Sequence, residues 1–426
     1  MARTSKKREV YVYADWEGLE GPVYMGILQA ELLRGKEIFS FEYDESWLKS
    51  GHAQLLDPDL QLYAGKQYLS DQEKQNFGMF LDSSPDRWGR ILMRRREAAL
   101  SREENRPQNN LFETDYLLGV YDEHRMGGLR FKLDLEGPFL NNNKEMASPP
   151  WASIRELEQI SLRLEEDDVV NDPEYLKWLS MLVAPGSSLG GARPKASVLD
   201  NENHLWIAKF PSKNDQTDIG GWEIVTYELA IEAKINMAEA QAKKFTTNKH
   251  TFLTKKFDRT STGERIHFAS AMTLLGHMDG EDYGEGVSYL ELVDFITTQG
   301  ANVNEDLEQL WRRIVFSICV SNTDDHLRNH GFILTNEGWI LSPAYDINPV
   351  ETGAGLKLNI SEDDNALDLD LALEVIPYFR IKEARANEII QEVKSAVQNW
   401  KKVATKYSIS NAEQELKSMA FSKAEV

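Results

Sequence analysis

The chain has 426 residues, of which 41% are hydrophobic and 10% aromatic, a composition typical of a soluble globular protein of two or three domains and not of a disordered chain. Its 48 lysines and arginines against 69 aspartates and glutamates give a formal net charge of −21. A surface this acidic repels phosphate backbones, so we do not expect the chain to bind nucleic acid by itself, and a basic partner suits it better.

Cysteine content and the pattern around the first strand bear on the cellular compartment. Cys319 is the only cysteine, which excludes an internal disulfide, and its apolar surroundings predict a buried, inert thiol. The basic residues 3–8 lead straight into a strand pattern without the apolar core of a signal peptide. No run approaches the roughly 18 apolar residues of a membrane span. We therefore expect a cytoplasmic protein.

The first 150 residues are expected to form a β-rich module. Short strands are predicted within residues 10–45, with breaks at the glycine positions Gly18, Gly21, Gly26 and Gly35. A helix is predicted to begin at Pro85, with a capping residue just before it. The basic residues 94–96 on that helix are interpreted as a solvated face, with an anion site as the alternative. The loop composition of residues 136–153 marks the first domain boundary.

Small residues and glycines gather in the segment 184–195, which contains Gly190, Gly191 and Ala192. Backbone N–H groups in such a segment can wrap a phosphate. The segment matches neither Gly-x-x-x-x-Gly-Lys-Ser/Thr nor Gly-x-Gly-x-x-Gly. Taken alone, it is therefore interpreted either as a plain surface loop or as a phosphate-binding loop.

Lys209 ends the second of two predicted strands, 196–200 and 204–210. At the end of an apolar strand its ammonium is placed as in a nucleotide site, where it would neutralise phosphate charge. The alternative is a lysine that only extends from a strand end into solvent.

A carboxylate is needed to hold that lysine in place. The helix predicted over 222–230, after a break at Gly220, offers Glu223 or Glu228, and we favour Glu223 because it lies nearer the strand. The next predicted strand, 251–259, is placed where its backbone could meet a nucleotide base.

Asp324 stands five positions before Asn329, and Asp346 follows about one hairpin later. Protein kinases use this spacing for an aspartate that orients the acceptor hydroxyl and for two groups that hold Mg²⁺. A polar turn that ends a buried helix is the structural alternative. His326 and His330, four positions apart, raise a metal-hydrolase alternative whose other ligands are unspecified.

From about residue 260 onward the pattern is mainly helical. Helices are predicted over 288–299, 305–320, 367–378 and 383–400, and a hairpin is predicted over 331–341.

Five motifs follow one another in the chain: Leu-Gly-Gly-Ala-Arg-Pro-Lys (189–195), Trp-Ile-Ala-Lys-Phe-Pro (206–211), Lys-Phe-Asp-Arg (256–259), Asn-Thr-Asp-Asp-His-Leu-Arg-Asn (322–329) and Leu-Ser-Pro-Ala-Tyr-Asp-Ile (341–347). Together they resemble the HipA family of serine/threonine kinases, the toxins of type II toxin–antitoxin modules. Residues 41–48 look like the amino-terminal module of these toxins, so the resemblance covers nearly the full chain.

The resemblance implies an α+β, two-lobed protein-kinase-like fold. It would consist of an amino-terminal β-rich module over 1–150, a small lobe over 151–258 and a mainly helical large lobe over 259–426.

The resemblance also implies site roles in an ATP- and Mg²⁺-dependent protein kinase. Asp324 would act on the acceptor hydroxyl, and Asn329 and Asp346 would bind Mg²⁺. The ATP-binding set is Lys209, Glu223, Lys255, Phe257, Gly190, Gly191, Ala192 and His326, with Lys255 and Phe257 lining the adenine through their backbone. We expect His326 to hydrogen-bond and so hold the catalytic loop in shape.

Regulation and partners follow from the same resemblance. The family's regulatory loop carries a serine that phosphorylates itself, and Ser188 matches it by its distance from Gly191, with Ser187 as the neighbouring possibility. The expected partner is a HipB-like helix-turn-helix antitoxin dimer, through which the toxin would meet operator DNA only indirectly. The expected substrate is a protein such as an aminoacyl-tRNA synthetase, glutamyl-tRNA synthetase being the best-known family target. Arg193 and Lys255 depart from the family pattern.

Two other functions remain open at this point. Small-molecule phosphotransferases use the same Asp and Asn roles, and a nucleotide-binding co-repressor that has lost catalysis would keep the fold. The presence of Lys209, Asp324, Asn329 and Asp346 together argues against the silent co-repressor.

Overall fold

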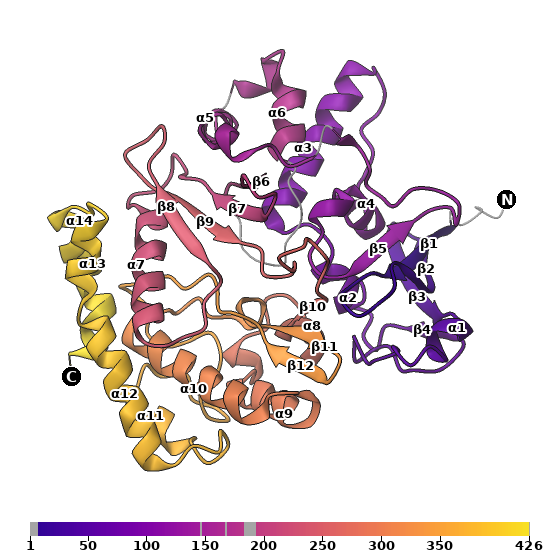
Figure 1. Ribbon diagram of the computed structural model, residues 1–426. Coiled ribbons are helices and arrows are strands. Elements are labelled where there is room, and N and C mark those ends of the chain that lie inside the picture. Colours follow the sequence, from indigo (N-terminus) through magenta and orange to yellow (C-terminus); the bar gives the residue numbers. More distant parts are fainter. Residues whose placement is uncertain (1–6, 145–146, 167, 183–192, 426) are drawn as a thin grey trace. The chain divides into compact units, whose positions relative to one another are not determined.

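A computed structural model describes residues 7–144, 147–166, 168–182 and 193–425 (Figure 1). They divide into two compact units, one within residues 1–207 and 258–278 and the other within residues 208–257 and 279–426. The division passes through strand β7 (Leu205–Lys209). Helices and strands are mixed, so the predicted α+β class is confirmed. The three domain boundaries expected from the sequence stay a prediction.

The first unit contains a five-stranded antiparallel sheet with the strand order β4-β3-β2-β1-β5 (Figure 1). Its strands are β1 (Lys7–Ala14), β2 (Val23–Leu33), β3 (Lys36–Tyr43), β4 (Lys66–Tyr68) and β5 (Leu129–Lys132). Val10, Val12 and Ala14 alternate along β1 and are all buried, as expected for a sheet with one covered face. Val12 lies opposite Phe131 of β5 in the register.

The predicted break at Gly26 is wrong, because Gly26 lies inside the 11-residue strand β2. A Cβ atom there would lie 2.2 Å from the carbonyl oxygen of Glu42 in β3. Glycine is therefore needed for the close approach of two backbones and not for a turn. The predicted break at Gly35 is confirmed, since Arg34 and Gly35 both have positive φ at the β2–β3 turn.

The first unit also contains α1 (Glu45–Leu48), α2 (Gly78–Asp82), α3 (Arg87–Glu103), α4 (Glu113–Gly119), α5 (Ile154–Arg163), α6 (Tyr175–Leu182), β6 (Lys195–Leu199), β10 (Phe268–Ser270) and α8 (Ala271–Leu275). The predicted start of α3 is displaced by two residues, because Asp86 and not the residue before Pro85 caps the helix by accepting a hydrogen bond from the Gly89 N–H at 2.8 Å. Asp86 also accepts from Lys195 Nζ at 2.7 Å, and both side chains are buried.

The basic cluster on α3 is only partly solvated. Arg94 is exposed as predicted. Arg95 donates to the carbonyl oxygen of Leu164 at 2.8 Å, and Arg96 donates to the hydroxyl of Ser180 in α6 at 3.3 Å. Two of the three guanidinium groups therefore make hydrogen bonds to other segments of the first unit. For these two residues the expectation of a solvated helix face is wrong.

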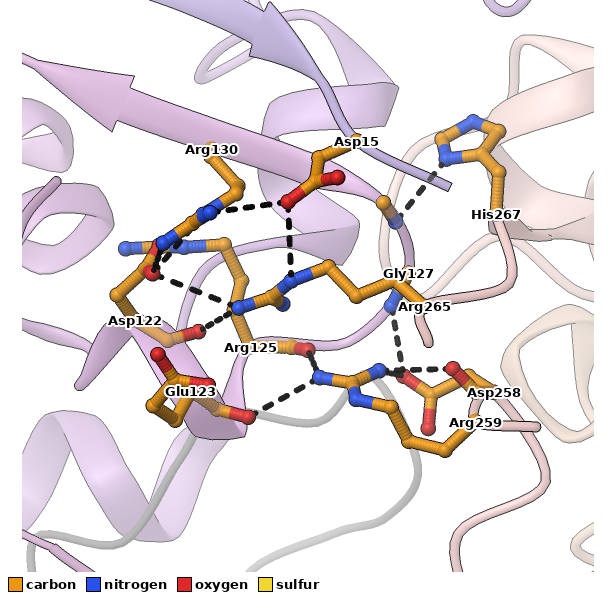
Figure 2. A network of polar contacts seen from close by, with 11 residues as sticks. Asp15, Asp122, Glu123, Arg125, Gly127, Arg130, Asp258, Arg259, Arg265 and His267 are labelled. Carbon is orange, nitrogen blue, oxygen red and sulfur yellow. Dashed lines mark hydrogen bonds and ion pairs between the residues drawn. The ribbon is translucent and has the colours of Figure 1, made fainter. Parts of the chain in front are cut away.

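Arginine and aspartate side chains form a polar network in the first unit (Figure 2). Arg130 donates to Asp15 at 2.9 Å and also pairs with Asp122. Arg265 donates to the backbone carbonyl of Asp122 at 2.8 Å. Gly127 donates its backbone N–H to Asp258 at 2.8 Å. These contacts tie the segment that begins at Asp258 to the start of β5 and the end of β1.

Arg125 joins this network through its carbonyl oxygen, which accepts from Arg259 at 2.9 Å, and its side chain is completely buried. Its guanidinium donates to the backbone carbonyl oxygens of Ser83, Leu117, Val120 and Leu140. Burial lowers the pKa of Arg125 to about 9. The residue therefore acts as a cross-link between three backbone segments within the unit, the end of α2, the end of α4 and the segment at Leu140.

His267 lies at the edge of the network and is buried. Its Nδ1 accepts from the Gly128 N–H at 3.4 Å, and its ring stacks on Trp16 with centroids 4.8 Å apart. Burial lowers the pKa of His267 to about 3. Between that value and the ordinary pKa near 6.5, the folded chain binds fewer protons than the unfolded chain, so stability must fall as pH falls through this range.

We therefore expect His267 alone to reduce the free energy of unfolding by about 1.4 kcal/mol for each pH unit below about 6.5. The His267→Gln variant should lose this part of the pH dependence, and His52→Gln, at an exposed histidine, should keep it. Urea unfolding at pH 6.5 and pH 5.5 measures the difference. Equal pH dependence in wild type and His267→Gln would contradict the assignment.

The second unit is mainly helical and holds two antiparallel strand pairs, β8 (Ala240–Lys243) with β9 (Thr251–Lys255), and β11 (Gly331–Thr335) with β12 (Gly338–Leu341). Its helices are α7 (Ile219–Glu232), α9 (Tyr289–Gln299), α10 (Val303–Cys319), α11 (Leu369–Glu374), α12 (Glu383–Val397), α13 (Trp400–Lys406) and α14 (Asn411–Lys417). The hairpin and the helices that become α9 and α10 are confirmed. The Cys319 thiol is buried as predicted.

Three sequence expectations in this unit are corrected. Gly220 does not break the chain but lies in the first turn of α7, where a Cβ atom would lie 2.3 Å from the carbonyl oxygen of His250. The helix expected over 367–378 is shortened to α11. The helix expected over 383–400 ends at Val397, and α13 begins at Trp400, whose ring stacks on Phe421 at a centroid distance of 4.5 Å. No helix in the described part of the chain is long and apolar enough to cross a membrane.

Candidate functional site

Lys209, at the end of β7, is the centre of a buried charge cluster in the second unit. Its Nζ donates to Glu223 Oε1 at 2.6 Å and to Asp346 Oδ1 at 2.7 Å. Lys209 and Glu223 are both buried. Burial alone would lower the pKa of Lys209, but the negative charges of Asp346 and Glu223 outweigh it and raise the pKa above its ordinary value. The ammonium is therefore held charged between two carboxylates.

Glu223 reaches Lys209 because α7 begins just before it. Asp218 caps α7 by accepting from the Gly221 N–H at 3.0 Å, and it also accepts from the His250 N–H at 2.7 Å. This fixes the first turn of α7 against the start of β9. Glu228, the other carboxylate considered from the sequence, instead contacts Lys406 and Tyr407.

Asp346 follows the β11–β12 hairpin in an unusual backbone conformation. Its φ is +57°, in the left-handed region that favours glycine. The next residue is fixed to α7, since the Thr226 hydroxyl donates to the carbonyl oxygen of Ile347 at 2.6 Å. Conformations of this kind persist where surrounding contacts enforce them and are concentrated at functional sites.

The loop 321–330 lies beside the Asp346 segment. The Asn348 N–H donates to Asn322 Oδ1 at 3.3 Å, and the Val350 N–H donates to the Ser321 carbonyl oxygen at 3.1 Å. A Cβ atom at Gly353 would lie 2.1 Å from the Thr323 side chain, so the chain after Asp346 also approaches the loop closely. The sequence-predicted aspartates are thus carried by adjacent segments of one unit.

Asp324 and Asn329 take opposite positions in this loop. Asp324 is exposed, whereas Asn329 is buried. The Asn329 side chain donates from Nδ2 to the backbone carbonyl oxygen of Asp324 at 2.9 Å. Its Oδ1 is buried and has no hydrogen-bond partner among the described residues.

An unpaired buried amide oxygen is costly unless a ligand satisfies it. Carboxylate and amide oxygens are the donors that Mg²⁺ prefers, and Mg²⁺ in phosphate sites takes only one or two protein ligands and fills its shell with phosphate and water oxygens. Asn329 Oδ1 and the Asp346 carboxylate fit such a site. No cluster of three His, Cys, Asp or Glu side chains suited to a metal occurs in the described ranges, which gives the metal-hydrolase alternative no support.

Sequence reasoning missed the residue that anchors this loop. Asp325 is buried, and its carboxylate accepts from the Tyr289 hydroxyl at 2.5 Å and the Ser317 hydroxyl at 3.4 Å and lies 3.1 Å from His330 Nε2. Burial would raise the pKa of Asp325, but His330 and the Tyr289 hydroxyl outweigh it and keep the pKa below its ordinary value. The sequence contains one signal for this burial. The apolar helix predicted just before the loop favours a buried position for one of the two adjacent aspartates.

His326 holds the loop through its backbone. Its N–H donates to the Asp324 carbonyl oxygen at 3.0 Å, and its carbonyl accepts from the Asn329 N–H at 2.8 Å. Its ring Nδ1 is buried without a hydrogen-bond partner within the described chain. We expected a hydrogen bond from the His326 side chain to hold the loop in shape. In the structure, the main chain of His326 and the side chain of Asp325 make the hydrogen bonds that hold it.

Lys255 and Phe257 lie at and just beyond the end of β9. The Lys255 N–H donates to the Glu239 carbonyl oxygen at 2.8 Å. If the backbone of Lys255 binds a nucleotide base, its carbonyl oxygen is therefore the group that would make the contact. The Phe257 ring stacks on Tyr345 with centroids 5.6 Å apart, which places it next to the residue before Asp346. Gly190, Gly191, Ala192, Ser187 and Ser188 lie outside the described residues.

The family of the chain follows from a sequence comparison. Residues 187–400 match the family model of the HipA-like C-terminal domain, which is half of the chain. The chain belongs to the HipA-like family. The matched range of this HipA-like chain contains Lys209, Glu223, Asp324, Asn329 and Asp346.

Comparison of structures agrees at the level of the fold. The HipA-like chain is similar to HipA in the Shewanella oneidensis MR-1 structure described as the toxin–antitoxin system HipA, HipB and its operator DNA complex, with a TM-score of 0.64 over 98% of this chain and 96% of that chain at 16% identity. Such an identity shows a shared fold alone. The Helicobacter pylori proinflammatory kinase CtkA matches with a TM-score of 0.35, 17% identity and coverage of 54% and 94%, which is too low to support an argument.

A Haemophilus influenzae protein named "Putative kinase" is 25% identical over 179 residues, which are 38% of this chain and 52% of that protein. The chain spans about half the length of the curated relative it matches.

Proposed function

We propose that this HipA-like chain is an ATP- and Mg²⁺-dependent protein serine/threonine kinase that acts as the growth-arrest toxin of a toxin–antitoxin module. The observation that carries the proposal is the cluster Lys209–Glu223–Asp346 beside a loop that exposes Asp324 and buries the unpaired Asn329 Oδ1. An ammonium, an exposed carboxylate and two oxygen ligands are the groups that phosphoryl transfer requires.

Each residue has a distinct task in this proposal. Lys209, held by Glu223, neutralises the negative charge of the ATP phosphates. Lys255 and Phe257 contact the adenine ring through their backbone. Asn329 and Asp346 hold Mg²⁺, which supplies charge neutralisation at the phosphate oxygens when bound. Asp324 stands exposed and orients the acceptor hydroxyl or accepts its proton. Because the Asp346 carboxylate already contacts the Lys209 ammonium, it would be shared between that ammonium and the metal ion.

Partner, substrate and regulation belong to the same proposal. The Shewanella HipA structure contains HipB and operator DNA, which supports a HipB-like helix-turn-helix antitoxin dimer as the partner of this chain. In this proposal the antitoxin binds the DNA, and this chain is brought to the DNA by the antitoxin. The net charge of −21 suits a basic partner. We propose a protein substrate such as an aminoacyl-tRNA synthetase, autophosphorylation at Ser188 or Ser187, a cytoplasmic location and the domain division 1–150, 151–258 and 259–426.

Incubating the purified chain with Mg²⁺ and ATP labelled in the γ-phosphate tests the reaction class. One reaction contains proteins of a cell lysate, and a parallel one contains aminoglycosides and sugars. Acid-stable label on protein serine or threonine supports the proposal. Label on a small molecule alone would replace it with a small-molecule phosphotransferase, and bound ATP without transfer to any acceptor would replace it with a silent nucleotide-binding co-repressor.

A further inference from the structure

The buried carboxylate of Asp325 contacts three side chains, Tyr289, Ser317 and His330. Two of its partners are hydroxyl donors on separate helices, because Tyr289 begins α9 and Ser317 lies near the end of α10. The third, His330, is the last residue of the loop itself and directly precedes β11. The side chain thus fixes the loop 321–330 to helices α9 and α10 and lies against the last residue of the loop. The hydrogen bonds from the Tyr289 and Ser317 hydroxyls are charge-assisted, and bonds of this kind are stronger than neutral ones.

The neighbouring residue points the other way. Asp324 is exposed, while Asp325 is 4% exposed. These two residues share one peptide unit, and its carbonyl oxygen accepts both the Asn329 Nδ2 hydrogen bond at 2.9 Å and the His326 N–H hydrogen bond at 3.0 Å. The orientation of that single peptide therefore affects both the exposed carboxylate and the Asn329 amide.

Resting on the proposed function, we propose that Asp325 is the positioning residue of the site: its carboxylate fixes the Asp324–Asp325 peptide and thereby sets the direction of Asp324 and the orientation of Asn329 Oδ1. Asp325 itself contacts neither nucleotide nor metal in this proposal. Residues that orient metal ligands in this way change metal affinity or activity by about 10- to 100-fold when they are replaced.

Asp325→Asn keeps the size of the side chain and removes its charge, and Tyr289→Phe removes one of its hydrogen bonds. For Asp325→Asn we expect the turnover number of phosphate transfer to fall by about 10- to 100-fold and the Mg²⁺ concentration for half-maximal ATP binding to rise by about 10-fold. ATP affinity at saturating Mg²⁺ should change by less than about twofold, because the contacts of Lys209 and Phe257 remain. Tyr289→Phe should change both quantities in the same direction by a smaller factor.

Asp294→Asn, at an exposed position on α9, serves as the control and should change neither quantity. A wild-type protein that transfers no phosphate at all would refute the proposed function and leave the Mg²⁺ dependence of ATP binding to decide the role of Asp325. A folded Asp325→Asn variant with wild-type turnover and wild-type Mg²⁺ dependence would overturn the positioning role, even if its melting temperature fell. If Asp325→Asn does not fold, unchanged values in Tyr289→Phe would overturn it.

Discussion

Replacing Asp324 by asparagine is expected to lower the rate of phosphate transfer by about 10³-fold, the scale of a lost general base. Asparagine keeps the shape of the side chain and cannot accept the proton of the hydroxyl. The free energy of unfolding should change by less than about 0.5 kcal/mol, because Asp324 is exposed and the loop is bonded through its backbone carbonyl.

Asp363→Asn is the matched control, because Asp363 is another exposed aspartate of the same unit. It should retain full activity and full stability. Steady-state transfer to protein, with circular dichroism melting on the same samples, makes the comparison. Transfer by Asp324→Asn at the wild-type rate would remove Asp324 from the proposed site.

The second large effect is expected at Lys209. In Lys209→Met, Glu223 stays 4% exposed without its ammonium partner, and leaving one member of a buried ion pair costs about 3 kcal/mol or more. Adding Glu223→Gln should recover most of this stability, because the fully buried carboxylate is then neutral and the Asp346 side chain, the other partner of Lys209, is partly exposed. Phosphate transfer should stay lost in both variants, since neither can neutralise the phosphates.

Lys406 and Glu228 provide a surface control for that cycle. Their side chains are 2.6 Å apart, but the Lys406 side chain is 61% exposed, so Lys406→Met should cost only about 0–1 kcal/mol. Denaturant unfolding of Lys209→Met, of Glu223→Gln alone, of the double variant and of Lys406→Met, each against the wild type, gives the four values needed. A stable, active Lys209→Met protein would contradict the role assigned to the lysine.

The pairing of Lys209 with Glu223 could be predicted because both residues belong to local patterns, the end of an apolar strand and the start of an apolar helix. The role of Asp325 could not be predicted in this way. Its burial depends on Tyr289 and Ser317, which reach it from two separate helices, and two adjacent aspartates are equally typical of an exposed turn.

Two of the local errors, at Gly26 and Gly220, have one physical reason. A glycine that permits a close approach of two backbones and a glycine that breaks an element look the same in a sequence. Gly26 and Gly220 are both of the first kind, with neighbouring carbonyl oxygens 2.2 Å and 2.3 Å from the position of a Cβ atom. The partner strand or loop that makes this approach is remote from Gly26 by 16 positions and from Gly220 by 30.

Calorimetric titration of ATP, with Mg²⁺ and with EDTA, tests most directly the claim that this cluster is a Mg²⁺·ATP site. The wild-type chain should bind ATP more tightly with Mg²⁺, and Asp346→Asn should lose most of that gain while still binding ATP in EDTA. Equal ATP affinity of the wild type in Mg²⁺ and in EDTA, or a full Mg²⁺ effect in Asp346→Asn, would contradict the account.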